Sequence, residues 1–384
     1  MEVYGEKYMK LRMVATCLFG LEKLLGEEID AIGGKRVETI DGRITFDGDE
    51  RVLAMANLKF RFAERIFIWM GSFPAYSFDA LFEGTKAIPW ENFIRKDDIF
   101  PVKGHAIKSK LFSVPDCQSI VKKAVVDRLS SKYGIRIFPE ENVKYQIEFF
   151  IFKDIATLMI DTSGIALHKR GYRCESGEAP LRETLAAAVA AIARPKDDVL
   201  FWDPFCGSGT IAIEAALQAT NTPAGILRSF AAEDFPAFDK SLWQDARDEA
   251  IAEIKTDSTF MSYASDIDGE VLKKAEANAK RAGVTKHIKI FKADARNIKK
   301  LDMRGTIACN PPYGERLMTQ NEVEALYRDI GRAFDKCAPW QTYVLTSAEN
   351  FERLYGRRAD KIRKLYNGMI PCRLYQYFKF FDKK

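Results

Sequence analysis

The stretch VLFWDPFCGSGT, from Val199 to Thr210, combines an acidic residue, a glycine loop and a helix start. A buried-type strand is expected to end at Asp203, and Gly207 and Gly209 follow before the helix opens. Glycines let the backbone approach a ligand closely, and the first N–H groups of a helix have no partner within it. The acid and the lack of a third glycine disfavour a nicotinamide dinucleotide. An adenosyl ligand with a cationic sulfonium and an amino group fits better, although a tight turn alone also explains two glycines.

Acidic residues end the next two expected strands as well. Asp266 follows MSYAS, where its carboxylate could accept both hydroxyls of a ribose. The alternative is a capping role for the helix that starts near Asp268. Asp294 follows IKIFKA and could reach an adenine amino group, or it is an ordinary loop aspartate.

The segment TIACNPPYGERL places Asn310 at the end of another strand, followed by Pro311, Pro312 and Tyr313. The Asn310 side-chain oxygen and the Pro311 carbonyl can accept the two N–H groups of an exocyclic amine whose ring stacks on Tyr313. An aryl amine is a poor nucleophile, so holding both hydrogens would direct its nitrogen and stabilise the positive charge that develops there. A simple Asn-Pro turn is the alternative.

The surrounding elements divide the chain of 384 residues into three expected units. Residues 1–65 read as a β-α-β-β-α-β unit of ferredoxin-like type, with a hairpin about Asp41-Gly42. Residues 66–162 form a second α+β unit with a helix over about 119–131, and residues 163–384 alternate strands and helices as in a doubly wound, mainly parallel sheet. The stretch 221–260 is expected to be an insertion or an elaborated crossover.

Composition narrows the class of protein. Hydrophobic residues make up 47% and charged residues 29%, with a net charge of +5, which excludes a disordered chain and allows a nucleic-acid partner. The seven cysteines are scattered and the three histidines are far apart, so we expect neither a disulfide framework nor a metal site. No apolar run is long enough for a membrane helix and no signal peptide is evident, which favours a cytoplasmic protein.

Residues 102–132 hold seven Lys/Arg against two Asp. This excess is typical either of an RNA-binding surface or of a solvated face. The candidate RNA-binding residues are Lys103, Lys108, Lys110, Lys122, Lys123 and Arg128.

The motifs DPFCGSGT, SDID, KAD and NPPYGERL, in this order, resemble class I S-adenosylmethionine-dependent amino-methyltransferases. The upstream segment HKRGYRCESGEAPLRETLAAAVA is similar to the THUMP-domain RNA methyltransferases, in particular the branch that methylates guanine N2 in bacterial 23S rRNA. GHAIKSKLFSVPDCQSIVKKAVVDRL is similar to a THUMP RNA-binding domain that follows a ferredoxin-like unit. The resemblance implies a Rossmann-like catalytic domain over 163–384, a THUMP domain over 66–162, S-adenosylmethionine as cofactor and 23S rRNA as partner.

The resemblance also assigns site residues. It implies that the cofactor's methionine side meets the glycine loop, its ribose meets Asp266, its adenine meets Asp294, and that 182–184 close over it. The implied cofactor-binding residues are Arg182, Glu183, Thr184, Asp203, Pro204, Phe205, Gly207, Gly209, Thr210, Asp266, Ile267, Asp294, Ala295 and Asn310. The implied catalytic clamp consists of Asn310, Pro311, Pro312 and Tyr313.

Other functions fit parts of the pattern. The same clamp suits adenine N6 in RNA or DNA, or a glutamine amide of a protein. A non-catalytic RNA-binding or ribosome assembly factor and an NAD-dependent oxidoreductase are rivals of other classes. The GERL extension, the THUMP-type N-terminus and the absence of an evident DNA-recognition insertion favour guanine N2.

Overall fold

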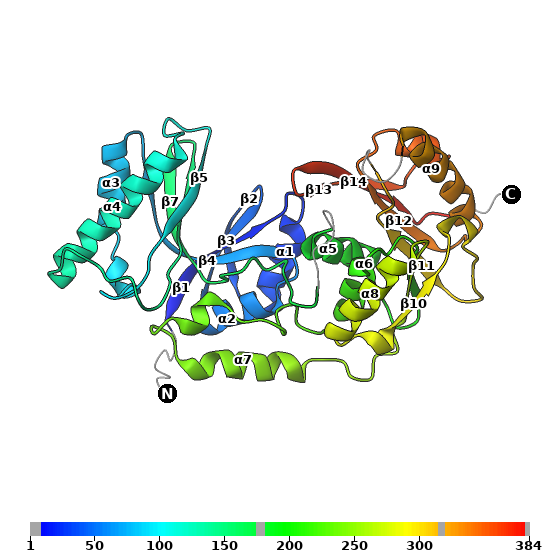
Figure 1. The fold of residues 1–384 in the computed structure, drawn as a ribbon, viewed down its shortest axis with the longest axis horizontal. Helices are drawn as coiled ribbons and strands as arrows, with labels where there is room; N and C mark the ends of the chain where they lie inside the picture. Colours follow the sequence, from blue (N-terminus) through cyan, green and yellow to red (C-terminus); the bar gives the residue numbers. More distant parts are fainter. Residues whose placement is uncertain (1–8, 174–180, 314–318, 381–384) are drawn as a thin grey trace, which may run out of the picture.

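The computed structural model describes residues 9–173, 181–313 and 319–380. The first sheet has seven strands in the order β2-β3-β1-β4-β7-β6-β5 (Figure 1). Its strands are β1 (Lys10–Cys17), β2 (Lys35–Ile40), β3 (Arg43–Asp49), β4 (Ala63–Pro74), β5 (Val102–Ile107), β6 (Ile147–Phe152) and β7 (Ile155–Asp161). Four helices accompany them: α1 (Glu22–Ala31), α2 (Glu50–Lys59), α3 (Phe78–Ala87) and α4 (Val114–Tyr133).

The order β1-α1-β2-β3-α2-β4 confirms the predicted ferredoxin-like unit, and the hairpin forms about Asp41-Gly42 as expected. The α4 helix starts earlier than predicted, since Pro115 lies in its first turn, where a missing N–H costs nothing. The boundary expected at residue 65 falls inside β4, which pairs with β1 on one side and with β7 on the other. The first two units therefore share one continuous sheet.

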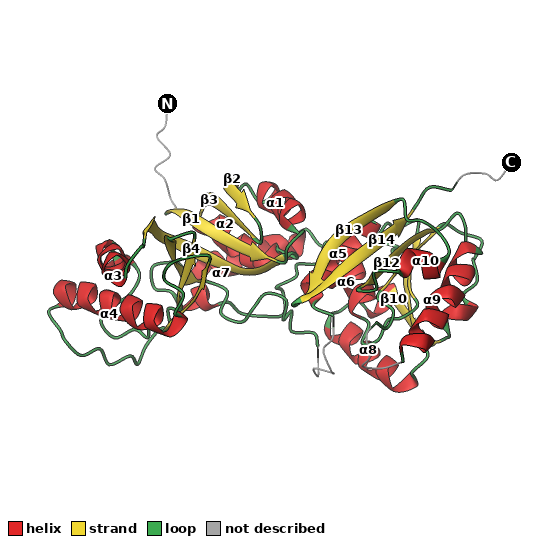
Figure 2. Cartoon of the chain, turned by 90° about the horizontal axis from the view of Figure 1, so that it is seen from above, coloured by secondary structure: helices red, strands yellow, loops and turns green. Residues whose placement is uncertain are grey.

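The second sheet has the order β10-β9-β8-β11-β12-β14-β13, with helices on both faces (Figure 2). Its strands are β8 (Leu200–Asp203), β9 (Ser262–Asp266), β10 (Ile288–Lys292), β11 (Gly305–Cys309), β12 (Gln341–Thr346), β13 (Lys361–Asn367) and β14 (Ile370–Tyr377). Its helices are α5 (Glu183–Ala193), α6 (Thr210–Ala219), α8 (Gly269–Arg281), α9 (Gln320–Asp335) and α10 (Phe351–Tyr355). Between α6 and β9 the chain also forms α7 (Lys240–Ala252), which lies against the first unit.

The strands β10, β9, β8, β11 and β12 are parallel, and β14 and β13 add an antiparallel pair at one edge. This arrangement confirms the predicted doubly wound, Rossmann-like fold. Side chains of β8 alternate between the two faces: Phe201 joins one apolar cluster, whereas Leu200 and Trp202 join the other. Both faces of the sheet are thus buried under helices.

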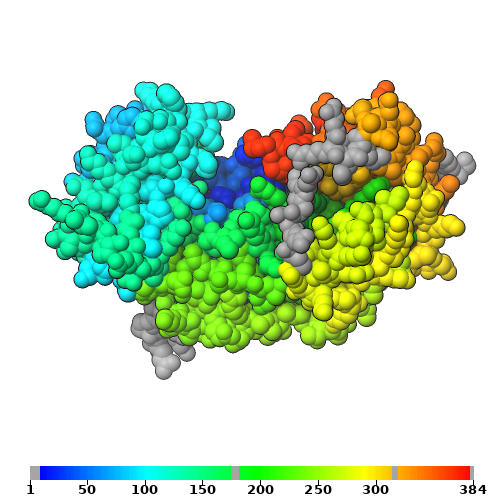
Figure 3. Space-filling view, in the orientation of Figure 1, coloured from blue at the N-terminus to red at the C-terminus, as the bar shows by residue number. Residues whose placement is uncertain are grey.

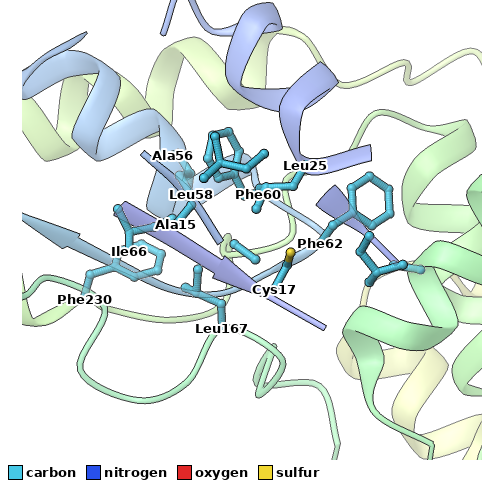
Figure 4. Close-up of a cluster of buried hydrophobic side chains, with 14 of the residues drawn as sticks. Ala15, Cys17, Leu25, Ala56, Leu58, Phe60, Phe62, Ile66, Leu167 and Phe230 are labelled. Carbon is cyan, nitrogen blue, oxygen red and sulfur yellow. The ribbon is translucent and has the colours of Figure 1, made fainter. Parts of the chain in front are cut away.

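The unassigned stretch 221–260 turns out to join the two sheets. Its helix α7 runs along α2 of the first unit, and Lys59 pairs with Glu253 at 2.6 Å (Figure 1). Phe230 lies beside Ile66 of β4 in a cluster that Leu167 also enters (Figure 4). The apolar core therefore runs without interruption from the ferredoxin-like unit into the catalytic unit.

Glu64 of β4 is the polar counterpart of this junction. Its carboxylate accepts hydrogen bonds from Thr184 Oγ1 at 2.6 Å and Arg182 at 3.1 Å, and it pairs with His168 Nδ1 at 2.9 Å. Burial opposes the charged carboxylate, but the hydrogen bonds from His168 and Thr184 outweigh it, and the pKa of Glu64 lies below its ordinary value.

We predict that Glu64→Ala destabilises the protein near pH 7 by about 1.5–3 kcal/mol, the usual contribution of hydrogen bonds to a charged group. Because the folded-state pKa is lowered, this stabilisation exists above the ordinary pKa of 4.5 and is lost as the pH falls through the folded value. Denaturant unfolding of the variant and the parent protein at several pH values measures the difference. Glu27→Ala, which removes an exposed carboxylate, is the control; a loss at Glu64 that persists unchanged into acid would contradict the prediction.

Candidate active site

Four polar side chains meet at the carboxyl ends of β10, β9, β8 and β11. Asp203 ends β8, Asp266 ends β9, Asn310 directly follows β11, and Asp294 lies two residues beyond β10. After β8 the chain continues to its neighbour β9 on one side, and the neighbour on its other side is β11. The strand order therefore reverses between β8 and β11, and we call the space above the carboxyl ends of these two paired strands the β8–β11 gap. Open α/β sheets bind ligands at such a point.

The glycine loop lies above this gap. Gly209 caps α6 with φ +84°, and Gly207 has φ +51°; both values lie in the left-handed region that favours glycine. Asp266 Oδ2 accepts the Gly207 N–H at 3.0 Å and ties the loop to β9. A Cβ at residue 207 would meet nothing within 4 Å, which leaves open space at the backbone where a ligand can approach.

Asp203 is 1% exposed and accepts a hydrogen bond from the Phe205 N–H at 3.1 Å. Burial raises the pKa of Asp203, and the nearby Asp266 carboxylate raises it further. A cation at this position would offset both effects. The sulfonium and ammonium groups of S-adenosylmethionine are such cations, so the residues present fit this cofactor.

The two acids further along the sheet differ in their surroundings. Asp268, rather than Asp266, caps α8 by accepting the Glu270 N–H at 2.8 Å, while Asp266 Oδ1 accepts the N–H of Asp268 at 3.1 Å and supports the turn before the helix. Asp294 accepts from Arg296 through both carboxylate oxygens, at 2.6 to 3.0 Å, and Arg296 lowers the pKa of Asp294. If Asp294 contacts the adenine, its carboxylate must bind the adenine and Arg296 at the same time. The adenine contact stays a prediction. Two more residues with a predicted role in cofactor binding follow these acids directly and differ in exposure. Ile267 is 60% exposed, whereas Ala295 is buried.

The Asn310–Tyr313 turn is fixed from below. The Tyr327 hydroxyl donates to the Pro312 carbonyl at 2.9 Å, and it can at the same time accept from Thr346 Oγ1, which also lies 2.9 Å away. The side-chain oxygen Oδ1 of Asn310 is buried and has no hydrogen-bond partner within the described ranges. Such an atom costs free energy unless a ligand supplies a donor.

Tyr313 is held at its hydroxyl. Asn367 Nδ2 donates to Tyr313 Oη at 3.1 Å, and burial raises the pKa of Tyr313 to about 12. Asn367 and Tyr327 were missed by the sequence analysis, since they lie 54 and 15 residues from their partners and belong to no local motif. The GERL extension at 314–317 lies outside the described residues.

The upstream segment 182–184 reaches the site indirectly. Arg182 and Thr184 bind Glu64, while Glu183 is 3% exposed and lies 3.5 Å from Arg173. Arg173 also donates to Thr210 Oγ1, at the start of α6, at 3.0 Å. This segment therefore braces the glycine loop against β4, and its predicted closure over the cofactor stays a prediction.

The predicted RNA-binding residues fall into two groups. Lys122 forms an ion pair with Glu140 and donates to the Phe100 carbonyl at 3.1 Å, and Arg128 pairs with Glu91 at 2.6 Å. These two side chains are committed to contacts within the fold. The exposed members of the set are Lys103, Lys108, Lys110 and Lys123.

In the described part of the chain, no cluster of three His, Cys, Asp or Glu side chains could hold a metal ion. Six cysteines, all buried, are free, and Cys174 lies outside the described residues. Burial also raises the pKa of Cys206 in the glycine loop, as expected for a packing residue rather than a nucleophile. None of the described helices is both long and apolar enough to cross a membrane.

Comparison with known families agrees with this geometry. Residues 170–376 match the RMKL-like methyltransferase domain, residues 12–67 the RlmL ferredoxin-like domain, and residues 75–161 the THUMP domain. The chain belongs to the RMKL-like methyltransferase family. The matches confirm the prediction of a THUMP-domain RNA methyltransferase that uses S-adenosylmethionine.

Relatives cover nearly the whole of this methyltransferase. The chain is 43% identical to the putative RNA methyltransferase YpsC of Bacillus subtilis over 96% of each protein. Among solved structures, a predicted N6-adenine-specific DNA methylase from Listeria monocytogenes has a TM-score of 0.91 with 43% identity, covering 96% of each chain. The putative methyltransferase SMU.472, solved as a complex with SAH, also has a TM-score of 0.91, with 38% identity over 97% of this chain and 99% of that one.

We predict that Asp266→Ala weakens S-adenosylmethionine binding by roughly 1.5–3 kcal/mol, about ten- to a hundredfold, because the variant cannot make bidentate hydrogen bonds with the ribose. Isothermal titration calorimetry measures the dissociation constant. Asp268→Ala, two residues away on the α8 cap, should leave it nearly unchanged. Equal affinity of Asp266→Ala and the parent protein would rule out this ribose assignment.

Proposed function

We propose that this methyltransferase transfers a methyl group to an exocyclic base amine of RNA, most specifically guanine N2 in 23S rRNA. The observation that carries the proposal is the buried Asn310 Oδ1 at the switch point of the sheet, which has no hydrogen-bond partner among the residues that the structure describes. A primary aryl amine offers it a hydrogen-bond donor.

Each part of the clamp has a task in this reaction. Asn310 Oδ1 and the Pro311 carbonyl accept hydrogen bonds from the two N–H groups of the amine. The Pro312 carbonyl already accepts a hydrogen bond from the Tyr327 hydroxyl. Holding both hydrogens orients the nitrogen lone pair, and the two acceptor dipoles stabilise the positive charge that grows on nitrogen. Tyr313 stacks on the base with its hydroxyl protonated, in keeping with its raised pKa.

The residues on the glycine-loop side of the β8–β11 gap are proposed to bind the cofactor. S-adenosylmethionine supplies an electrophilic methyl group when bound. Asp203 would balance its cationic end, Asp266 would bind its ribose, and the open space at the Gly207 backbone would admit it. No general base is needed before methyl transfer, because the amine loses its proton, to water, only after its nitrogen has become cationic.

The choice of guanine over adenine as the acceptor base rests on resemblance to relatives, because the clamp itself suits both bases. Guanine N2 and adenine N6 both offer two N–H groups on a flat ring, and the Listeria relative bears the name of an adenine-specific DNA methylase. The Bacillus relative is named a putative RNA methyltransferase, and a THUMP unit precedes the catalytic unit here. NPPYGERL joined to that unit favours guanine, in large-subunit rRNA.

RNA is proposed to be gripped at a distance from the clamp. A guanine amine in a duplex is paired and lies in the minor groove, so the target nucleotide must be unpaired or flipped out. The exposed lysines of the THUMP unit would hold a neighbouring helix through its phosphates while the base enters the site.

Asn310→Ala tests the clamp. We expect cofactor affinity to remain nearly intact while methyl transfer falls by about 10²–10³, the usual effect of removing one transition-state hydrogen-bonding group. Calorimetry gives the affinity, and transfer of radiolabelled methyl groups to rRNA from a deletion strain gives the rate. Turnover at the parent rate would refute the clamp.

The product itself decides between the candidate bases. Nucleoside mass spectrometry of 23S rRNA should show N2-methylguanosine missing at one position in a deletion strain and restored by the parent gene, but not by Asn310→Ala. Missing N6-methyladenosine with an unchanged N2-methylguanosine level would assign the adenine alternative. Methylation of neither base, with retained RNA binding, would favour a non-catalytic assembly factor.

Removing the charges of the exposed lysines in the THUMP unit should weaken RNA binding at low salt. It should also flatten the dependence of log affinity on log salt, by about 0.7–0.9 for each phosphate that a lysine no longer neutralises. Filter binding from low to moderate salt measures both. The variant replaces Lys103, Lys108, Lys110 and Lys123 by Ala, and its control replaces Lys255, Lys280, Lys299 and Lys300. An unchanged slope in the first variant would identify these lysines as a solvated face.

A further inference from the structure

The β13–β14 hairpin reaches the clamp from the edge of the second sheet. Its strands are joined by Gly368 and Met369, and Asn367 pairs in register with Ile370. Gly368 has φ +64°, so the tight turn requires glycine. Because Asn367 also donates to Tyr313 Oη at 3.1 Å, the hairpin turn is fixed directly beside the ring proposed to receive the base.

The hairpin is supported along its length. β14 pairs with β12 from Arg373 to Tyr377, and Cys372 Sγ lies 3.9 Å from Tyr313 Oη. On its outer side, the ring of Tyr366 meets Phe19 of the first unit edge-on, with centroids 5.7 Å apart. The tip is thus held by contacts with both the catalytic unit and the ferredoxin-like unit.

The side chains at the tip are apolar and face solvent. Met369 is 95% exposed and Ile370 is 42% exposed, while Phe19 beside the hairpin is 52% exposed. The hairpin borders the notch between the two lobes, whose floor is formed by the first unit (Figure 3). An apolar tip on a rigid support facing such a notch suits insertion into a partner.

The charge of the hairpin identifies the partner. Residues 361–377 contain four Lys/Arg and no Asp or Glu. Lys361 and Lys364 are exposed on β13, and Arg373 pairs with Glu349 at 3.0 Å. Basic strands that carry an apolar tip match the phosphates and stacked bases of RNA. An apolar protein surface would offer no negative charges to pair with the lysines.

We propose that the hairpin tip unstacks the target nucleotide: Met369 enters the RNA stack at the place that the base leaves, and Asn367 holds Tyr313 to receive it. Chemistry on a base inside a helix requires its extrusion, and proteins separate base steps with apolar wedges that include methionine. Met369 is the wedge, and Asn367, acting through Tyr313, is a positioning residue. This inference rests on the proposed function, since it needs an RNA base as acceptor.

Two RNA substrates test the wedge. One is a folded 23S rRNA fragment around the nucleotide located by mass spectrometry, and the other is a short single strand of the same sequence around it. We expect Met369→Ala to lower kcat/KM on the folded fragment on the order of tenfold or more and to leave the single strand nearly unaffected, because only the folded RNA must be unstacked. Met303→Ala, which removes an exposed methionine outside the hairpin, should affect neither.

An equal effect of Met369→Ala on both RNAs, or none on either, would overturn the wedge. Since Met369 is almost fully exposed, its variant should keep the parent melting temperature, which checks that a loss of rate is not unfolding. If the parent protein methylates neither RNA, the proposed function itself fails and the wedge fails with it. The two failures are therefore distinguishable by the parent protein alone.

A double-mutant cycle tests the positioning residue. Asn367→Ala should lower kcat while leaving KM for RNA and cofactor affinity nearly unchanged, since the ring is still present but less well fixed. In a Tyr313→Phe background, which lacks the hydroxyl, Asn367→Ala should have no further effect. Independent, additive losses would show that Asn367 does not act through Tyr313.

Discussion

The pairing of β8 with β11 is the interaction on which the site depends. Leu200, Phe201 and Trp202 lie opposite Gly305, Thr306 and Ile307 in a parallel ladder. Because the strands run the same way, the residues that follow them emerge at one edge, where the glycine loop and Asn310 face each other. Gly305, at the start of β11, leaves room for the Trp340 ring that precedes β12, since a Cβ there would lie 2.3 Å from that ring.

The two lobes are joined by buried polar groups as well as by the apolar core. Arg61, after α2, donates to the carbonyl of Leu217 at 3.2 Å and to that of Thr222 at 2.6 Å, both in the catalytic unit. Arg170, in the catalytic unit, donates in turn to the carbonyl of Arg61 and to that of Leu167 at 2.6 Å. Buried guanidinium groups require such acceptors, so the interface has one well-defined arrangement rather than a sliding contact. The position of the THUMP unit relative to the Asn310–Tyr313 turn is set by this interface.

Local sequence predicted the features that depend on local geometry. A strand that ends in an acid and a glycine pair before a helix specify their own conformation, so Asp203, Asp266 and Gly209 lie where expected. The partners that complete the site come from distant segments and show no local signal. Glu64 is 120 residues from Thr184, and Asn367 is 54 residues from Tyr313.

Charge patterns were the least informative part of the sequence. A count of lysines and arginines over 102–132 could not separate Lys122 and Arg128 from their neighbours. Their acidic partners, Glu140 and Glu91, lie outside that window and meet them only through tertiary packing. Helix α7 was missed for a related reason: it is stabilised by the surface of α2, which lies far away in the sequence.

The strand β4 has a consequence for how this half of the molecule melts. Phe67 and Ile68 have hydrogen-bonded neighbours on both sides, in β1 and in β7. If either flanking unit unfolds, β4 becomes an edge strand with a row of unpaired N–H and C=O groups. Neither unit can then lose its structure without weakening the other, so we expect residues 9–161 to unfold cooperatively although they carry two family domains.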